Sequence, residues 1–394
     1  MSGETKQKIK LTAMVVPFLF GGSYAFHALN VSKVSYVSES ATVAKSSSTS
    51  ARGTTPEEAM KAAPQWPARL DTAEYDKRLL SLVHYTPPKP VPVSTTTGSS
   101  TLVAKPILPL YSSSSNVTIP GKRWPPEAVY PHGEAIVPFK RILAYYGNFF
   151  SRHMGILGEY EPDEVIRRLA ATQKLWEEAD PTTPVQPAIE YIAMVAQADG
   201  GADGMYRAMM PTKEIEKAYS MAKQIDAILI LDMQVGLSHI AAELPKFKTY
   251  LERPEVHLAI DPEFSMYGGH RPGTVIGTVS AAEVNQVIKH MSDIVREKQL
   301  PPKVLIVHRF TQNMVTNAEA ITPTPEVQVI VVMDGWGSRD LKRGTYSQII
   351  VPEPVQFSGL KIFYKNDLKP PSTAIFTPLE VLELNPKPIF IQYQ

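Results

Sequence analysis

The sequence lacks cysteine altogether across its 394 residues. Disulfide bonds, catalytic thiolates, zinc–thiolate sites and lipid anchors attached through cysteine are therefore excluded. The absence does not fix the cellular compartment, because an exported bacterial protein without cysteine is unremarkable.

The chain also lacks an excess of charge of either sign. It has 40 Lys and Arg residues against 39 Asp and Glu residues, for a formal net charge of +1. Binding to the phosphate backbone of nucleic acids needs a clear basic excess, so we expect no nucleic-acid partner. No Gly-x-Gly-x-x-Gly turn follows the first expected strand, which disfavours an open doubly wound sheet, and we expect no cofactor.

One long stretch near the N-terminus carries no formal charge, and it is just long enough to span a bilayer as a helix. The pattern predicts a cytoplasmic tail over residues 1–10, a transmembrane anchor over 11–30 and the rest of the chain on the extracytoplasmic face of the cell membrane. A cleaved signal peptide, with a poor cleavage site at residues 23–25, is an alternative that makes the protein secreted. Another alternative is that the stretch forms a buried helix of a soluble protein. The charges that set the orientation are Lys6, Lys8 and Lys10.

Residues 31–135 have the composition of an extended stalk. The chain has 35 prolines, which are most concentrated between residues 56 and 138. Ser and Thr are frequent in 44–53, and Ser, Thr and Pro dominate 88–100. Such segments cannot bury enough apolar surface to offset chain entropy. Two short helices are expected within the stalk, at Thr55–Glu58 and at Glu74–His84. The second is amphipathic and docks either on the main domain or on a protein partner.

From residue 136 to 394, apolar strand-like runs alternate with helical ones, which predicts parallel βα units. Eight units in about 250 residues match the size and count of a (β/α)8 TIM-like barrel. The last expected strand ends the chain, so part of the segment before residue 140 is expected to cover the place of an eighth helix. The strands are expected near 141–146, 187–195, 226–233, 255–261, 303–309, 327–333, 359–364 and 387–393.

Three helices within this region have clear start patterns. Residues 163–178 are amphipathic. Ser280–Glu283 and Thr377–Glu380 are capping boxes, and they open helices that run to about Lys298 and about Leu384.

Several expected strands end in acids. Residues 255–264 form an apolar run that ends in two carboxylates on either side of Pro262, and on a strand both would point the same way. A barrel brings the carboxyl ends of its strands to one rim. Glycoside hydrolysis needs one protonated and one ionised carboxyl group, and crowding of acids separates their pKa values in that manner. The candidate catalytic residues are Asp261, Glu263, Asp334 and Asp232.

Among these acids we favour Glu263 as proton donor, because it lies further out, and Asp261 or Asp334 as base or nucleophile. The alternative for each acid is that it caps the following helix or pairs with a basic side chain. His308 also ends a strand, where it either orients substrate or is a hydrogen-bonded rim histidine. A metal site built from His308, Asp232, Asp261 and Glu263 is a further alternative, although no metal-binding spacing supports it.

Other side chains near strand ends are candidates for substrate binding. Aromatic rings stack on sugars, with core packing as the alternative. Two glycine-rich loops, 198–204 and 264–273, are candidates for a lid, and their charged residues either contact substrate or form salt bridges within the loops. We expect a lysine on the seventh strand to point into the barrel, where it needs a carboxylate partner. The candidates are Tyr145, Tyr146, Asp203, Arg207, His308, Trp336, Lys361 and Tyr364.

Six short motifs recur here in a familiar order: Tyr145–Asn148, Met154–Glu159, Gly201–Arg207, Leu231–Gln234, Ala259–Glu263 and Gly359–Tyr364. With these motifs, residues 140–394 resemble a family of uncharacterised exported bacterial proteins, often lipoprotein-like. The resemblance implies a glycoside-hydrolase-like TIM barrel. It leaves the activity open, and an apolar helix must replace the cysteine-linked anchor of many such proteins.

Three functions remain open. The first is a membrane-tethered, extracytoplasmic glycoside hydrolase that acts on carbohydrate of the cell envelope or the environment by carboxylate acid–base chemistry. The second is a non-catalytic surface protein that binds glycan or a protein partner through the barrel. The third is a metal-dependent hydrolase. Fold class does not separate them, because barrels host many chemistries.

Overall fold

The computed structural model describes residues 66–84 and 124–394. The expected cytoplasmic tail, the apolar segment over 11–30 and the short helix at Thr55–Glu58 lie outside these residues, as does most of the expected stalk. Among the helices in the described ranges, none combines the length and the apolar character that a membrane span requires.

The predicted parallel barrel is confirmed. Eight parallel strands close into a ring, because the first strand, β1, pairs with both β2 and the last strand, β11. The ring runs in chain order, and a short antiparallel strand, β3 (Arg207–Met209), extends the end of β2. The eight strands are β1 (Arg141–Gly147), β2 (Val185–Ala196), β4 (Ile228–Met233), β5 (Val256–Ile260), β7 (Lys303–Arg309), β9 (Val327–Met333), β10 (Phe357–Ile362) and β11 (Phe390–Tyr393).

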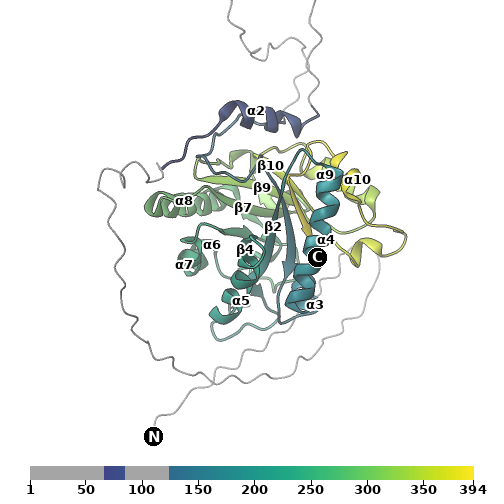
Figure 1. Ribbon diagram of the computed structural model, residues 1–394. Helices are drawn as coiled ribbons and strands as arrows, with labels where there is room; N and C mark the ends of the chain where they lie inside the picture. The colour runs from purple at the N-terminus through teal and green to yellow at the C-terminus, as the bar shows by residue number, and fades with distance from the viewer. Residues whose placement is uncertain (1–65, 85–123) are drawn as a thin grey trace, which may run out of the picture.

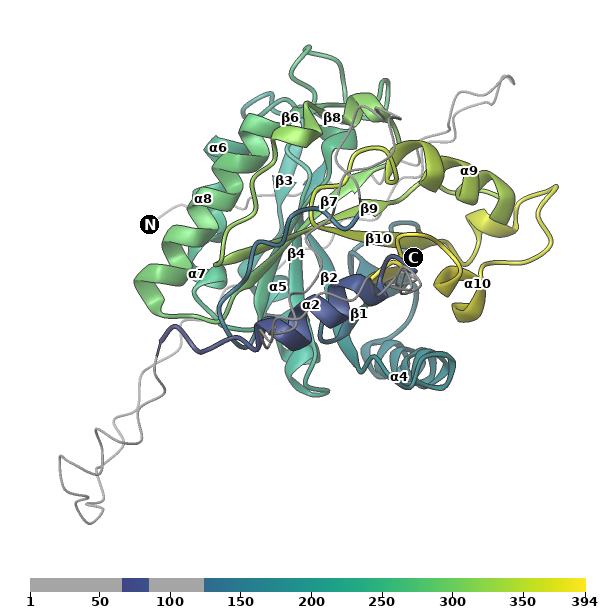
Figure 2. The same cartoon turned by 90° about the horizontal axis from the view of Figure 1, so that it is seen from above.

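Helices surround the ring on its outer face, as Figure 2 shows. Two of them begin at the predicted capping boxes, in which Ser280 and Thr377 each accept a hydrogen bond from the backbone of a glutamate three residues later. The principal helices are α4 (Pro162–Ala179), α5 (Thr212–Lys223), α8 (Ala281–Lys298), α9 (Arg339–Ile349) and α10 (Pro378–Leu382).

Short elements fill the loops between strands and helices. They are α3 (Ile156–Glu159), α6 (Ile240–Glu243), η1 (Leu244–Phe247), α7 (Lys248–Leu251), η2 (Pro262–Phe264), β6 (Val279–Ser280), η3 (Gln312–Met314), β8 (Val315–Thr316), η4 (Ala318–Ala320) and η5 (Asn366–Leu368).

The strands are buried on both faces, so two apolar cores form. Side chains alternate across each strand. On β1, Leu143 and Tyr145 belong to the outer core under the helices, whereas Ile142 and Ala144 belong to the core inside the ring. This alternation decides which polar residues of each strand enter the barrel.

A helix from the expected stalk closes the N-terminal end of the barrel. Helix α2 (Thr72–Ser81) buries Tyr75 and Leu79 in the same cluster as the inward residues of the strands. Arg78 donates a hydrogen bond to the carbonyl of Phe139 at 3.1 Å. Figure 1 shows α2 lying across one end of the barrel. The sequence allowed this helix to dock on the main domain or on a protein partner. In the structure it docks on the main domain.

Candidate functional site

The inward residues near the carboxyl ends of the strands are polar, in contrast to those before them. They come from six strands and are almost fully buried. Because a buried polar group is costly without a partner, their contacts with one another decide what this end of the barrel can do. These residues are Tyr146 on β1, Glu190 on β2, Asp232 on β4, His308 on β7, Lys361 on β10 and Gln392 on β11.

His308 lies between two carboxylates. Its Nε2 is 3.2 Å from Oε1 of Glu190, and its Nδ1 is 3.4 Å from Oδ2 of Asp334. Burial by itself lowers the pKa of His308, but the hydrogen bonds and charges of Asp334 and Glu190 outweigh it and hold the pKa well above the usual value. The imidazole is therefore a cation that fixes both acids, and Gln392 donates a further hydrogen bond to Glu190.

Asp232 and Asp261 are held by neutral donors. The Tyr146 hydroxyl donates to Oδ2 of Asp232 at 2.9 Å, and Nε2 of Gln234 donates to Oδ2 of Asp261 at 3.1 Å. Burial raises the pKa of Asp232 to about 7; His308 opposes the rise, whereas Asp261 and Glu190 add to it. Burial also raises the pKa of Asp261 to about 6, against the opposing charge of His308 and with the support of Asp334.

Glu263 also lies at the carboxyl end of the barrel, but it belongs to the turn after β5 and not to the strand itself. Strand β5 ends at Ile260, and the Asp261 side chain accepts a hydrogen bond from the backbone N–H of Glu263 at 3.2 Å, which caps the turn η2. The Glu263 side chain stays partly exposed. Burial, Asp261 and Asp334 raise the pKa of Glu263 well above its usual value, which favours the protonated form that a proton donor needs.

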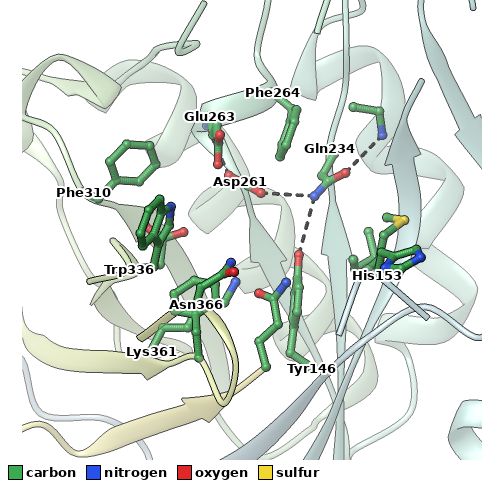
Figure 3. A pocket seen from close by; sticks show the side chains of 16 residues that line it. Tyr146, His153, Gln234, Asp261, Glu263, Phe264, Phe310, Trp336, Lys361 and Asn366 are labelled. Atoms are coloured by element: carbon green, nitrogen blue, oxygen red, sulfur yellow. Dashed lines mark hydrogen bonds between the residues drawn. The ribbon is translucent and has the colours of Figure 1, made fainter. Parts of the chain in front are cut away.

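A pocket of about 150 Å³ opens above this polar layer (Figure 3). Carboxyl groups and aromatic rings converge on it from different strands, while Lys361 enters from β10. Such a mixture of apolar walls and a few polar groups is typical of small-molecule sites. The lining residues are Tyr146, His153, Met154, Ile192, Ala196, Gln234, Asp261, Glu263, Phe264, Phe310, Asp334, Trp336, Lys361, Phe363, Asn366 and Gln394.

The structure brings most of the predicted site residues together. Asp261, Glu263, Asp334, Tyr146, Trp336 and Lys361 line the pocket, and Asp232 and His308 are buried against them. The carboxylate partner expected for Lys361 is not within 4 Å of its nitrogen among the described side chains. The ammonium group lies instead 3.9 Å from the centre of the Tyr146 ring.

Two predicted tyrosines lie elsewhere. Tyr145 points away from the barrel interior, and its hydroxyl is 2.7 Å from the Thr172 hydroxyl on α4 and 3.1 Å from the Tyr364 hydroxyl. Tyr364 stacks on Tyr393 with ring centres 5.1 Å apart. Both tyrosines therefore have the packing role that the sequence left as the alternative to sugar stacking.

Asp203 and Arg207 also lie outside the pocket. Arg207 pairs with Asp203 at 2.8 Å and with the buried Glu243 at 2.7 Å. This is the loop-internal ion pairing that the sequence allowed as an alternative. Arg271 donates to the carbonyl of Ala198 at 3.4 Å, so the two glycine-rich loops contact each other.

Sequence reasoning missed several residues of the site. Glu190 and Gln392 interrupt otherwise apolar strands, and the rarity of a polar residue in the middle of a buried strand is the pattern that identifies them. Gln234, Phe264, Phe310 and Asn366 lie in loops, where periodicity gives no information.

The proposed metal ligands do not form a recognisable metal site. In residues 66–84 and 124–394, no group of three or more His, Asp or Glu side chains has an arrangement suited to a metal ion. The nearby cations, His308 and Lys361, instead offset the charge of the acids.

Comparison of the chain with protein-family models finds no match, and comparison with curated proteins finds none either. The function is therefore inferred from the geometry of the pocket.

Proposed function

We propose that the barrel hydrolyses glycosidic bonds by general acid catalysis from Glu263. The observation that supports this proposal is the position of Glu263, partly accessible and with a raised pKa, in a pocket that it shares with Asp261 and Asp334. A protonated acid and an ionised carboxylate in one cleft are what this reaction requires.

In this mechanism the Glu263 carboxyl group donates its proton to the leaving glycosidic oxygen. Asp261 or Asp334 acts as the carboxylate that either activates water or attacks the anomeric carbon. His308 is a positioning residue, because its protonated ring holds Asp334 from below. Burial of the acids makes their charges more effective than in water.

The walls of the pocket suit a sugar. Phe264, Phe310 and Trp336 surround the opening, and aromatic faces stack on the apolar faces of sugar rings (Figure 3). The natural substrate that we propose is a carbohydrate of the cell envelope or the environment. The proposed location, on the extracytoplasmic face of the membrane, rests on the apolar stretch over residues 11–30 and the lysines before it. Membership of the exported barrel family rests on the six motifs alone.

Turnover of a polysaccharide panel by the full-length chain, by Glu263→Gln and by Asp261→Asn tests the proposal. Each substitution keeps the shape of the side chain and removes its acid–base chemistry. We expect a loss of rate of roughly 10²–10⁴-fold where the residue does general acid–base work. Glu178→Gln, an exposed glutamate at the end of α4, is the matched control and should keep the full rate.

Unchanged rates in both pocket variants would remove these acids from the mechanism. Binding of glycans without turnover across the panel would favour the non-catalytic surface protein instead.

A further inference from the structure

Lys361 is a buried cation that faces the pocket and forms no direct ion pair with the described residues. Its side chain is 5% exposed. Among the described residues, no carboxylate lies within 4 Å of its nitrogen, and its ammonium group is 3.9 Å from the centre of the Tyr146 ring and 5.1 Å from that of Phe363. A buried ammonium group without a counter-ion is costly. An anionic ligand in the pocket would supply a counter-charge at short range.

A second buried lysine nearby has a short-range anionic partner. Lys342 on α9 is 1% exposed, and its nitrogen pairs with Asp367 at 2.9 Å. The same nitrogen donates to the carbonyl of Lys361 at 2.6 Å and to that of Gly335 at 3.0 Å. The charge of Lys342 is thus neutralised inside the protein, and its hydrogen bonds fix the backbone from which Lys361 projects.

The surroundings of Lys361 offer hydrogen-bond donors to an anion. Asn366, in the turn that follows β10, lines the same pocket, and so does Gln394 beyond the end of β11. In Figure 3, Lys361 and Asn366 lie at one end of the pocket, and Glu263 and Phe264 lie at the other. The pocket therefore has hydrogen-bond donors at one end and Glu263, whose pKa is raised, at the other.

We propose that Lys361 binds the carboxylate of an acidic sugar, so that the substrates are glycans that contain uronic acid. The ammonium group pairs with the carboxylate at the donor end, which directs the glycosidic oxygen of the same sugar or its neighbour toward Glu263. This inference rests on the proposed hydrolysis for its catalytic part, whereas the anion subsite itself requires binding alone.

Besides binding an anion, Lys361 acts on the neighbouring acids through its charge, and the experiment must separate these two effects. Its charge lowers the pKa of Asp261 and of Glu263, although it is neither the largest nor the only influence on either group. Loss of this charge would change the rate with every substrate. Loss of an anion subsite would change only the binding of substrates that carry the anion.

The experiment measures equilibrium binding and turnover of oligosaccharides of galacturonic, glucuronic and mannuronic acid, together with their methyl esters. The esters keep the sugar and remove its charge. The proteins are the full-length chain, Lys361→Met and Lys365→Gln. Lys365 pairs with Glu159 at 2.7 Å on the surface next to the same strand, and it is the matched control for loss of one positive charge.

We expect at least one acid to bind more tightly than its ester to the wild type. Lys361→Met should weaken that binding by roughly 30-fold or more and leave ester binding within about twofold, whereas Lys365→Gln should change neither. Equal weakening for acids and esters, or no binding of any of the acids, would overturn the inference. Binding of an acid through Lys361 without hydrolysis would support the subsite and count against the proposed hydrolysis. Hydrolysis of the neutral esters with no preference for any of the acids would support the proposed hydrolysis and count against the subsite.

Discussion

The two ends of the barrel interior are built from the same strands and contain opposite kinds of residue. On β7, Val304 and Ile306 are inward and apolar, and His308, two residues further along, is inward and charged. At the N-terminal end, Tyr75 from α2 completes an apolar cluster. At the carboxyl end, the ring of polar residues supports the pocket.

The contrast between the two ends indicates which part of the barrel stabilises the fold and which part destabilises it. Burial of apolar side chains stabilises the N-terminal end, whereas burial of several acids at the other end costs free energy that their hydrogen bonds only partly return. A protein keeps such a cluster when it has a function, and its stability must then come from elsewhere in the fold. Changes at the N-terminal end should therefore affect stability, and changes at the carboxyl end should affect activity.

The largest expected effect is at the N-terminal end. Tyr75→Ala removes a fully buried ring from the barrel, and the cavity should lower the free energy of unfolding by about 3–5 kcal/mol. Tyr75→Phe keeps the ring and is the control. Denaturant unfolding measures both variants, and turnover of the folded fraction should match the wild type. An equally stable Tyr75→Ala would mean that α2 is not part of the barrel core.

The second prediction concerns pH and the carboxyl end. Asp232 and Asp261 have folded-state pKa values of about 7 and about 6, above an unfolded value of about 3.9. The unfolded chain therefore loses these protons first as pH rises, and stability should fall between about pH 4 and about pH 7. The raised pKa of His308 acts in the same direction, because its contribution is complete below an unfolded pKa of about 6.5 and is lost as pH rises through the folded value.

Asp232→Asn isolates the contribution of one acid. The amide still accepts a hydrogen bond from Tyr146 and does not ionise, so the variant should lose less stability than the wild type between about pH 4 and about pH 7. Glu178→Gln, on the surface, is the control. Unfolding curves at several pH values measure the slope. An Asp232→Asn variant whose stability changes with pH as the wild type does would show that ionisation of Asp232 costs no stability.

The barrel was predictable because the strands are mostly apolar runs and three of the helices have clear start patterns. Eight such runs allow few other arrangements. The acids at the strand ends were identifiable for the same reason, since a carboxylate after an apolar run stands out. The turn at Pro262 was less predictable, because alternation places Glu263 correctly only while the strand continues, and it ends at Ile260.

Contacts that depend on loops or on distant strands were not predictable. The position of His308 between Glu190 and Asp334 joins three strands, and no local pattern encodes that contact. Asn366 and Phe310 enter the pocket from loops. Neighbouring tyrosines on β1 were both assigned to the site, although the alternation of a strand allows only one of them to face inward.

The smallest expected effect tests this last point. The hydroxyl of Tyr145 lies behind β1, 2.7 Å from that of Thr172, whereas the hydroxyl of Tyr146 donates to Asp232 inside the barrel. Tyr145→Phe should cost about 1 kcal/mol of stability through the lost hydrogen bond and leave glycan binding and turnover unchanged. Tyr146→Phe is the matched comparison one residue away, and it should alter the pH dependence of turnover because Asp232 loses its donor. Denaturant unfolding and pH–rate profiles of both variants provide the measurement. If Tyr145→Phe weakened substrate binding while Tyr146→Phe did not, the two faces of β1 would be assigned the wrong way round.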